Sequence, residues 1–345
     1  MNFLHNFLVK LDKCLDRRTT EMQNAETQSL AIQLYNSYGT ERQFRVRGRV
    51  LIPHRRFRPA LPDDGIFTTL LNMYFRIYSR EVAGVTVRLW VEIDDSFGNS
   101  TKQTVDVVSN DEGYIDAILA TNTPLTDGVY LLKGEVLAAP FELIFTYINE
   151  SSIFIYNKNS HLGLISDIDD TVILTESYSG LRTLYHTFLF NAFRRTVLPH
   201  VKAWYSELTR NGELPTFYLS SSPWNLYDVL TQIFQINGLP KATVLLRDYG
   251  IDYDKMLLGS HTAHKRQAID DILATYPNTL FILSGDTAQY DPDIYLAVAK
   301  DYGSRIQTIF IRDVGLPDRS ARIAPFLAEA KALGIDMRIL SACGK

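Results

Sequence analysis

Apolar and polar residues alternate with a period of two between about residues 43 and 148. In the first such stretch Phe44 and Val46 alternate with Arg45 and Arg47, as expected for a half-exposed strand. The alternating stretches cover residues 43–52, 86–93, 102–108, 114–119, 129–137 and 141–148. Turn signals separate them at residues 95–99, 110–113 and 127–128. Short strands at this spacing are typical of an antiparallel β-sandwich, and we predict one over residues 43–157.

Beyond about residue 150 the pattern changes, because short apolar runs now alternate with stretches of helical period. Such runs are typical of strands that are buried on both faces of a parallel sheet. We predict strands at residues 162–165, 217–219, 243–246, 280–283 and 306–311. We predict helices at residues 181–193, 201–209, 224–236, 265–276 and 294–302. This alternation predicts an α/β domain over residues 158–345, with ligands bound beyond the carboxyl ends of a parallel sheet.

The first 42 residues are predicted to form an N-terminal helical segment. Near its start, apolar residues recur at helical spacing while acidic and basic residues occupy the other faces. The apolar stripe consists of Phe3, Leu4, Phe7, Leu8, Leu11, Cys14 and Leu15. The helix either lies in a membrane interface or packs on its own protein, and the mixed charge of its polar face favours the second interpretation. A further helix is predicted over residues 19–37.

Composition narrows the classes of protein that fit this chain. It has 345 residues, of which 46% are hydrophobic and 21% charged, and this suits two or three globular domains. A net charge of −4 gives no indication of nucleic-acid binding. The two cysteines, Cys14 and Cys343, form neither a disulfide framework nor a zinc pattern, and they fit a reducing cytosol. The sequence lacks the pattern of a membrane span or a signal peptide, so we expect a cytoplasmic protein.

The most informative chemistry lies at the end of the apolar run 162–165. Asp167, Asp169 and Asp170 follow it in the sequence Asp-Ile-Asp-Asp-Thr, which ends at Thr171. Carboxylates that crowd at a strand end repel one another and lose solvation unless a cation or proton offsets that cost. The cluster therefore indicates a Mg²⁺ site with one carboxylate free to act as a nucleophile. The alternative is an acidic turn that closes the strand.

Two further polar clusters follow later in the chain. Ser220 and Ser221 come directly after the run 217–219, where a hydroxyl and backbone N–H groups that lead into a helix can hold a phosphate oxygen. A helix N-cap explains Ser220 equally well. Lys265 opens the helix predicted at 265–276, a position that is unfavourable for a cation unless the ammonium faces a bound anion. A solvated lysine is the alternative.

The last polar positions follow two other predicted strands. Asp286 and Asp291 come after the run 280–283 and supply further carboxylates at a strand end. A helix N-cap is the alternative for Asp291. Arg247 follows the run 243–246, and its side chain either reaches the substrate or pairs locally.

In this order, the clusters resemble the motifs of the haloacid dehalogenase superfamily of phosphohydrolases. The resemblance covers residues 162–313 and is closest to the actin-patch phosphatidate phosphatase family, whose bacterial members are also similar from about Gly48 onward. The residues that carry it lie at 163–171, 218–226, 246–248, 264–265 and 285–295. It implies a Rossmann-like parallel sheet without a large cap domain, a Mg²⁺ cofactor, and hydrolysis of a phosphomonoester through an aspartyl-phosphate.

The resemblance also implies a role for each site residue. Asp167 would attack phosphorus, and Asp169 would protonate the leaving group and then activate water. Asp167, Asp169 through its backbone carbonyl, and Asp286 would ligate Mg²⁺. Ser220 and Lys265 would hold the phosphoryl oxygens. The residues implied to support these groups or to contact the substrate are Thr171, Ser221, Arg247 and Asp291.

The sequence leaves the substrate and the role of Asp170 open. The gaps 172–219 and 221–264 hold no large cap, and an open site suits a phosphate carried by a membrane lipid or by a protein. The aromatic stretch 178–193 fits either a membrane contact or an ordinary core helix.

We expect a phosphatidate phosphatase that releases diacylglycerol and phosphate, with phospholipid as its partner and peripheral contact with a membrane. One alternative is the same chemistry on a soluble or protein phosphomonoester. The other is a non-catalytic lipid-binding adaptor, although a binding protein has no need of both Asp167 and Asp169. Asp170 either ligates the metal through water or caps the turn.

Overall fold

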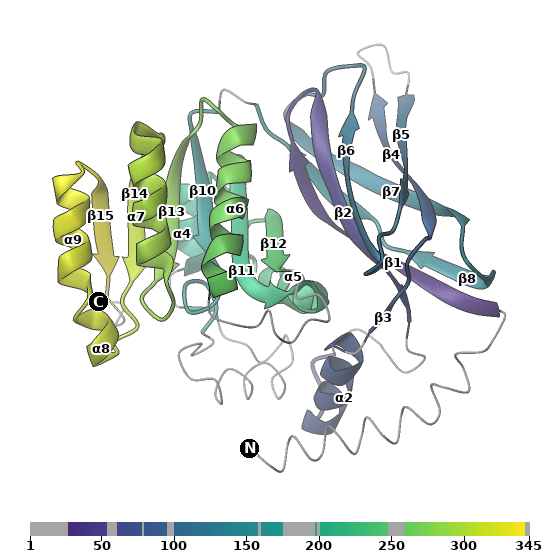
Figure 1. Cartoon of the computed structure of the whole chain (residues 1–345), viewed down its shortest axis with the longest axis horizontal. Coiled ribbons are helices and arrows are strands. Elements are labelled where there is room, and N and C mark those ends of the chain that lie inside the picture. The colour runs from purple at the N-terminus through teal and green to yellow at the C-terminus, as the bar shows by residue number, and fades with distance from the viewer. Residues whose placement is uncertain are drawn as a thin grey trace.

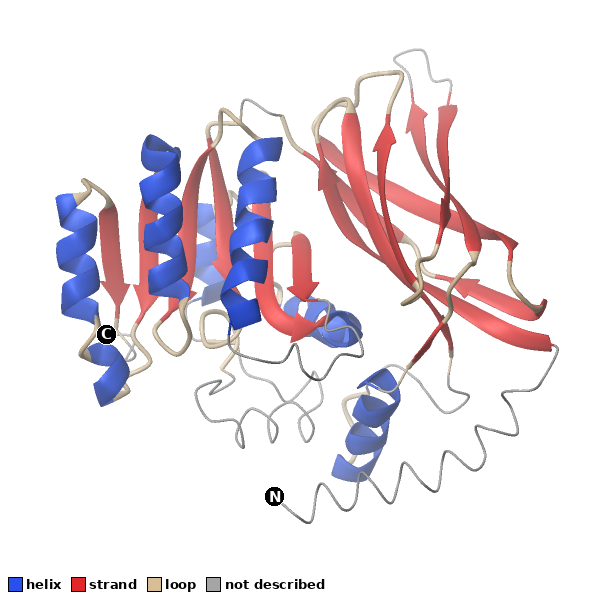
Figure 2. Ribbon diagram, viewed as in Figure 1, coloured by secondary structure: helices blue, strands red, loops and turns tan. Residues whose placement is uncertain are grey.

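The computed structural model describes residues 27–53, 61–77, 79–94, 100–157, 160–174, 197–198, 201–247 and 259–341. Within these residues the chain forms two β-sheets that lie side by side, one of nine strands and one of six (Figures 1 and 2). The predicted apolar stripe over residues 3–15 and the aromatic stretch 178–193 lie outside the described residues. Among the helices that are described, none has the length and apolar character needed to cross a membrane.

The nine-stranded sheet contains all the strands that were predicted between residues 43 and 148. Its strands are β1 (Thr27–Gly39), β2 (Gln43–Ile52), β3 (Arg80–Glu81), β4 (Thr86–Asp94), β5 (Ser100–Val108), β6 (Tyr114–Ala120), β7 (Gly128–Ala138), β8 (Glu142–Ile148) and β9 (Ser151–Ile155). Most neighbours are antiparallel, but β1 pairs in parallel with both β8 and β9. The prediction of a purely antiparallel sandwich is therefore wrong in this respect, because the long β1 joins all nine strands into one mixed, curled sheet.

Strand β1 is where the sequence prediction failed most clearly. A helix was predicted over residues 19–37, but the chain is a strand from Thr27 to Gly39. Leu30, Ile32 and Leu34 alternate along it and are at most 1% exposed, since they point into the core of the nine-stranded sheet. A helix would place Ile32 on the face opposite to Leu30 and Leu34, whereas the strand buries all three together in the core.

Helix α2 (Ile66–Ile77) was not predicted and follows β2. Met73 of α2 packs in the same hydrophobic cluster as the core of the six-stranded sheet. Tyr35 and Tyr38 of β1, with Phe154 of β9, belong to that cluster as well. The Tyr276 hydroxyl donates a hydrogen bond of 2.8 Å to the carbonyl oxygen of Gly39 across the boundary. The two sheets therefore share a continuous packed interface.

The six-stranded sheet is parallel throughout, as predicted. Its strands are β10 (Leu162–Asp167), β11 (Thr216–Pro223), β12 (Thr243–Arg247), β13 (Leu280–Asp286), β14 (Ile306–Arg312) and β15 (Asp336–Leu340). They lie in the order β12-β11-β10-β13-β14-β15. This is the order of a doubly wound sheet, in which the strand order reverses at one point, here between β10 and β13. Sheets of this kind bind their ligands at that point.

Helices cover both faces of the six-stranded sheet, with α6 and α7 toward the viewer and α4 behind (Figure 2). They are α4 (Val201–Leu208), α5 (Tyr227–Asn237), α6 (Gly259–Thr275), α7 (Asp291–Tyr302), α8 (Pro317–Ser320) and α9 (Ile323–Ala332). Two 3₁₀ turns, η2 (Trp224–Leu226) and η4 (Gly303–Arg305), complete the set.

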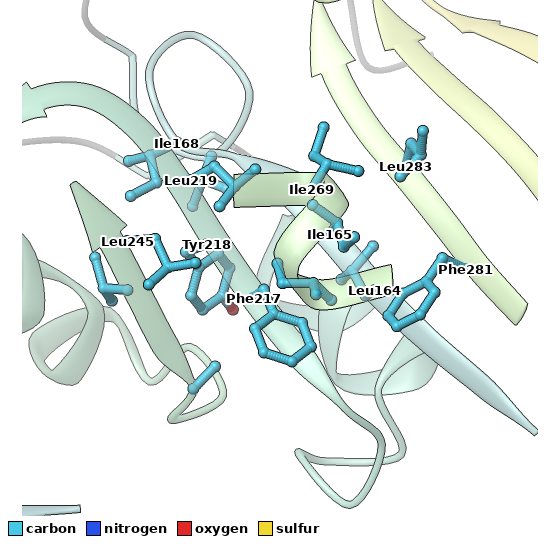
Figure 3. Close-up of a cluster of buried hydrophobic side chains, with 14 of the residues drawn as sticks. Leu164, Ile165, Ile168, Phe217, Tyr218, Leu219, Leu245, Ile269, Phe281 and Leu283 are labelled. Carbon is cyan, nitrogen blue, oxygen red and sulfur yellow. The ribbon is translucent and has the colours of Figure 1, made fainter. Parts of the chain in front are cut away.

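Figure 3 shows part of the core beneath the central strands. The rings of Phe217 and Phe281 lie near each other in this core, with their centroids 6.4 Å apart. A Cβ at Gly163 would lie 2.6 Å from Cε1 of Phe281, so only glycine allows this close packing beside β10. The packing fixes the strand whose last residue is Asp167.

Candidate active site

The polar clusters that the sequence singled out converge at the carboxyl ends of β10, β11 and β13. Asp167 is the last residue of β10, and Asp286 is the last residue of β13. Ser220 lies near the end of β11, and Asp291 is the first residue of α7. Lys265 reaches the same place from α6. This is the point at which the strand order reverses, so the fold brings together residues that are up to 124 positions apart.

Lys265 forms two buried ion pairs at the centre of the cluster. Its Nζ lies 2.6 Å from Oδ1 of Asp167 and 2.6 Å from Oδ1 of Asp291. All three side chains are at most 2% exposed. Burial by itself would lower the pKa of Lys265, but Asp167 and Asp291 outweigh burial and raise this pKa, so the ammonium stays charged.

The position of Lys265 within its helix differs from the prediction. Helix α6 begins at Gly259, six residues earlier than the predicted start, so Lys265 does not open the helix. Its ammonium therefore does not lie at the unfavourable end of the helix dipole. The carboxylates of Asp167 and Asp291 hold the ammonium instead.

Asp167 and Asp286 are fully buried acids whose charges are only partly offset. Among the described residues, Oδ2 of Asp167 is buried without a hydrogen-bond partner. Asp286 accepts hydrogen bonds from the Ala288 N–H (2.5 Å) and from the Thr171 hydroxyl (3.1 Å). Burial, followed by the charge of Asp291, raises the pKa of Asp286 to about 7. Burial likewise raises the pKa of Asp167 well above its usual range, against the opposing effect of Lys265.

The donor set fits a hard divalent cation. Carboxylate oxygens of Asp167, Asp286 and Asp291 lie within 4.8 Å of one another. When all are ionised, these three carboxylates and the ammonium of Lys265 leave two negative charges in a buried place, which a divalent cation would neutralise. Oxygen ligands of this kind are those that Mg²⁺ prefers. The buried Oδ2 of Asp167, without a hydrogen-bond partner among the described residues, is the observation that best fits a cation ligand at this position.

Asp291 is already engaged on both of its oxygens. Oδ1 pairs with Lys265, and Oδ2 accepts the backbone N–H of Asp286 at 3.3 Å. Because α7 begins at Asp291 and its preceding residue, Tyr290, occupies the cap position, the N-cap alternative for Asp291 is wrong. Asp291 thus ties α6 to the end of β13.

Asp169 turns its carboxylate toward the serines of β11. The Ser220 hydroxyl donates a hydrogen bond of 2.7 Å to Oδ2 of Asp169, and the Ser222 hydroxyl lies 3.4 Å from the same oxygen. The backbone N–H of Ser222 donates in turn to Oγ of Ser220 (2.9 Å). Asp169 is 9% exposed, whereas Asp167 is completely buried. Of these two acids, Asp169 is therefore the one that solvent reaches.

Asp170 shapes the turn that follows β10. Its φ angle of 57° lies in the left-handed region, which aspartate tolerates better than most residues. Its backbone N–H donates to the carbonyl oxygen of Ile173 (2.7 Å), and its own carbonyl accepts a hydrogen bond of 2.6 Å from Nη1 of Arg312. Sequence reasoning missed Arg312, whose place as the last residue of β14 was the only available signal.

The remaining predicted residues, Ser221 and Arg247, lie on β11 and β12. Arg247 ends β12 opposite Pro223 of β11 and is 5% exposed. Burial, with the nearby positive charge of Arg247, lowers the pKa of His264 to about 4, so this imidazole is neutral at pH 7. Ser221 lies in β11 directly after Ser220 and is half-buried.

Comparison with known proteins agrees with this site. Residues 162–313 match the family described as "Phosphatidate phosphatase APP1, catalytic domain", a range that contains every site residue named above. Over 223 residues the chain is 27% identical to "Phosphatidate phosphatase APP1" of Saccharomyces cerevisiae (strain ATCC 204508 / S288c), covering 62% of this chain and 38% of that protein. An uncharacterized protein of Schizosaccharomyces pombe (strain 972 / ATCC 24843) is also 27% identical, over 226 residues, covering 64% of this chain and 36% of the relative.

The chain therefore spans less than two fifths of the length of these curated relatives. Its closeness to the phosphatidate phosphatase APP1 family is confirmed over the matched part. A likeness to one solved structure is weak. The crystal structure of CBD12 from CALX1.2 has a TM-score of 0.21 and 9% identity, covering 42% of this chain and 54% of that one, which is too weak a likeness to carry an argument.

Proposed function

We propose that this chain is a Mg²⁺-dependent phosphatase of the haloacid dehalogenase type that hydrolyses phosphatidate to diacylglycerol and phosphate. The single observation that carries the proposal is the environment of Asp167. It ends the central strand β10, it is completely buried beside Lys265, and one of its oxygens has no hydrogen-bond partner among the described residues. The match of residues 162–313 to a phosphatidate phosphatase catalytic domain supports the reaction class.

In the first step, a carboxylate oxygen of Asp167 attacks phosphorus and forms a P–O bond, while the bond from phosphorus to the ester oxygen breaks. Asp169 donates its proton to the departing alkoxide, which leaves as the alcohol. In the second step, Asp169 takes a proton from a water molecule as that water attacks phosphorus, which frees Asp167 and phosphate. The greater exposure of Asp169 supports its role as the group that exchanges protons with water.

Asp167, the backbone carbonyl of Asp169 and Asp286 would hold Mg²⁺. When bound, the cation offsets the negative charge of the phosphoryl group and of the buried acids. The Thr171 hydroxyl and the Ala288 N–H orient the carboxylate of Asp286 through the hydrogen bonds described above.

Lys265 and Ser220 would bind the phosphoryl oxygens as charge develops on them. Asp291 keeps the ammonium of Lys265 in place at 2.6 Å. The Ser220 hydroxyl, which now donates to Asp169, would turn to the phosphoryl group when substrate is present. Ser221 and Arg247 would contact the rest of the substrate, and Asp170 serves the turn rather than the reaction.

A phospholipid would be the partner of this site, reached by peripheral contact with a membrane from the cytoplasm. The alternatives are a soluble or protein phosphomonoester, or an adaptor without catalysis. The test is to assay phosphate release from phosphatidate in mixed micelles beside a panel of soluble phosphomonoesters, with Mg²⁺ and with EDTA. Turnover of phosphatidate that requires Mg²⁺ is expected. Turnover of a soluble ester without turnover of phosphatidate would reject the lipid substrate, and no turnover of either would reject catalysis.

A further inference from the structure

The segment that directly follows Ser220–Ser222 contacts strand β1 of the nine-stranded sheet and helix α2. Trp224 and Asn225 lie in η2, and Tyr227 and Asp228 begin α5, only a few residues beyond Ser220. Each of the four contacts a residue of β1, of α2, or of the loop just after α2. We propose that strand β1 of the nine-stranded sheet and helix α2, with the loop after it, form a clamp that positions the Ser220 hydroxyl for phosphoryl binding.

The first contact of the clamp is a partly buried ion pair. Nε of Arg76 lies 3.1 Å from Oδ1 and 2.9 Å from Oδ2 of Asp228, and Nη2 of Arg76 lies 2.8 Å from Oδ2. The side chain of Arg76 is only 3% exposed, and that of Asp228 is 32% exposed. Bidentate arginine–carboxylate pairs fix geometry as well as adding energy, because two parallel hydrogen bonds define one orientation. The ion pair therefore sets the position of the first turn of α5 relative to α2.

A second contact fixes the 3₁₀ turn itself. Nδ2 of Asn225 donates a hydrogen bond of 2.8 Å to the backbone carbonyl of Arg76, at the end of α2. The same nitrogen lies 3.3 Å from Oγ of Ser79. Arg76 thus holds the segment through both its side chain and its backbone.

Strand β1 supplies the third part of the clamp. The ring of Tyr35 stacks on Trp224 with a centroid distance of 4.2 Å and an interplanar angle of 12°. It also contacts the ring of Tyr227 at 4.6 Å. The backbone N–H of Asn36 donates a hydrogen bond of 2.6 Å to the Tyr227 hydroxyl. Aromatic pairs of this kind add directional attraction to the burial of the rings.

The clamp acts where the segment has little support of its own. Neither η2 nor α5 has a side-chain cap at its N-terminus in the described chain, so contacts from β1 and α2 take over the role of holding this end. Ser220 is four residues before Trp224, and its hydroxyl is already ordered between Asp169 and the N–H of Ser222. A shift of η2 would move this hydroxyl, and displacements of about 1 Å from productive geometry cost up to roughly 100-fold in rate.

The inference gives the nine-stranded sheet a role in the reaction, and it rests on the proposed phosphatase function. Arg76 is here a positioning residue that acts through Ser220 and never touches the substrate. A purely adhesive interface would affect stability alone, whereas a clamp affects the rate in a way that depends on Ser220.

The experiment compares Arg76→Met and Asp228→Asn with Arg88→Met in the full chain. Arg88 pairs with Asp106 in the same two-bonded manner, at 2.7 and 2.8 Å, on the exposed face of the nine-stranded sheet, so Arg88→Met removes a matched pair away from the site. We expect the two clamp variants to lower kcat by about 10-fold to 100-fold with little change in KM, and Arg88→Met to leave both unchanged.

Two further measurements keep the outcome decisive. In a Ser220→Ala background, Arg76→Met is expected to lower kcat by less than about twofold more, because the group that it positions is gone. Hydrogen exchange of the backbone amides at 220–226 is expected to be at least about 10-fold faster in both clamp variants than in the wild type.

Unchanged kcat with unchanged exchange would overturn the clamp, as would a full additional loss of rate in the Ser220→Ala background. An inactive wild type would reject the proposed function instead, and the exchange rates would then decide by themselves whether the clamp holds the serine segment.

Discussion

Replacing Lys265 with methionine removes the ammonium group that the structure places among the buried site acids. The substitution keeps an unbranched side chain of similar length but deletes the ammonium that lies 2.6 Å from Asp167 and 2.6 Å from Asp291. Both carboxylates are at most 1% exposed, so water cannot solvate them in its place. Each carboxylate must then either take up a proton or stay charged at a cost to the free energy of folding.

The magnitude follows from the burial. Removing one partner of a buried ion pair typically destabilises a protein by about 3–5 kcal/mol, because the other charge is left without compensation. An exposed pair gives a matched comparison: Lys300 and Glu329 are 48% and 44% exposed, and such pairs contribute at most about 1 kcal/mol. For a cooperative unit of 150–250 residues, about 3–5 kcal/mol corresponds to a fall in Tm of roughly 6–20 °C.

The assay is thermal and denaturant unfolding of Lys265→Met and Lys300→Met, measured in EDTA at pH 7 so that no added cation replaces the ammonium. We expect Lys265→Met to unfold at a much lower temperature than Lys300→Met, which should stay close to the wild type. Equal stability of the two variants would refute the reasoning, because it would mean that the buried acids do not depend on Lys265.

Two other predictions concern the same region. A Cβ at Gly285 would lie 2.6 Å from Oδ2 of Asp291, so Gly285→Ala should lower the free energy of unfolding by about 1–3 kcal/mol and reduce phosphate release. A Cβ at Gly65 has no described atom within 4 Å, so Gly65→Ala should change the free energy of unfolding by no more than about 0.5 kcal/mol. An equal effect at both sites would show that packing against Asp291 does not matter. Burial and Arg247 hold the pKa of His264 near 4, below its usual 6.5, so the neutral imidazole contributes stability at pH 7 that is lost as the pH falls from about 6.5 to about 4. Between pH 6.5 and pH 4, denaturant unfolding should show the wild type losing up to about 3 kcal/mol more of its free energy of unfolding than His264→Gln. If the free energies of the two proteins fall in parallel with pH, His264 is not buried in its neutral form.

Five strands of the six-stranded sheet were predictable because they are largely buried on both faces, whereas the more exposed edge strand β15 was not predicted. Such strands appear in sequence as continuous apolar runs, and these runs located β10 through β14 close to their observed positions. Strand β1 was not predictable in the same way. Leu30 and Leu34 are four residues apart, a spacing that also fits a helix, and one of its partners, β8, lies more than 100 residues further along the chain.

That the site acids lie together could be predicted for a simple physical reason. Asp167 and Asp286 each end a strand, and the ends of parallel strands meet at one edge of the sheet. Arg312 was missed because it donates to the backbone carbonyl of Asp170, and Arg76 was missed because it pairs with Asp228, which is distant in the sequence. Contacts of that kind depend on how elements pack in three dimensions, which the local pattern of residues does not record.

The central claim is that Asp167 is the nucleophile of a Mg²⁺-dependent phosphatase. Its most direct test is phosphate release from phosphatidate in mixed micelles by the wild type and by Asp167→Asn, a variant of nearly the same shape, with unfolding curves to show that both are folded. We expect the wild type to release phosphate only with Mg²⁺ and Asp167→Asn to be slower by roughly 1000-fold or more. A folded Asp167→Asn that retains activity within tenfold of the wild type would contradict the claim.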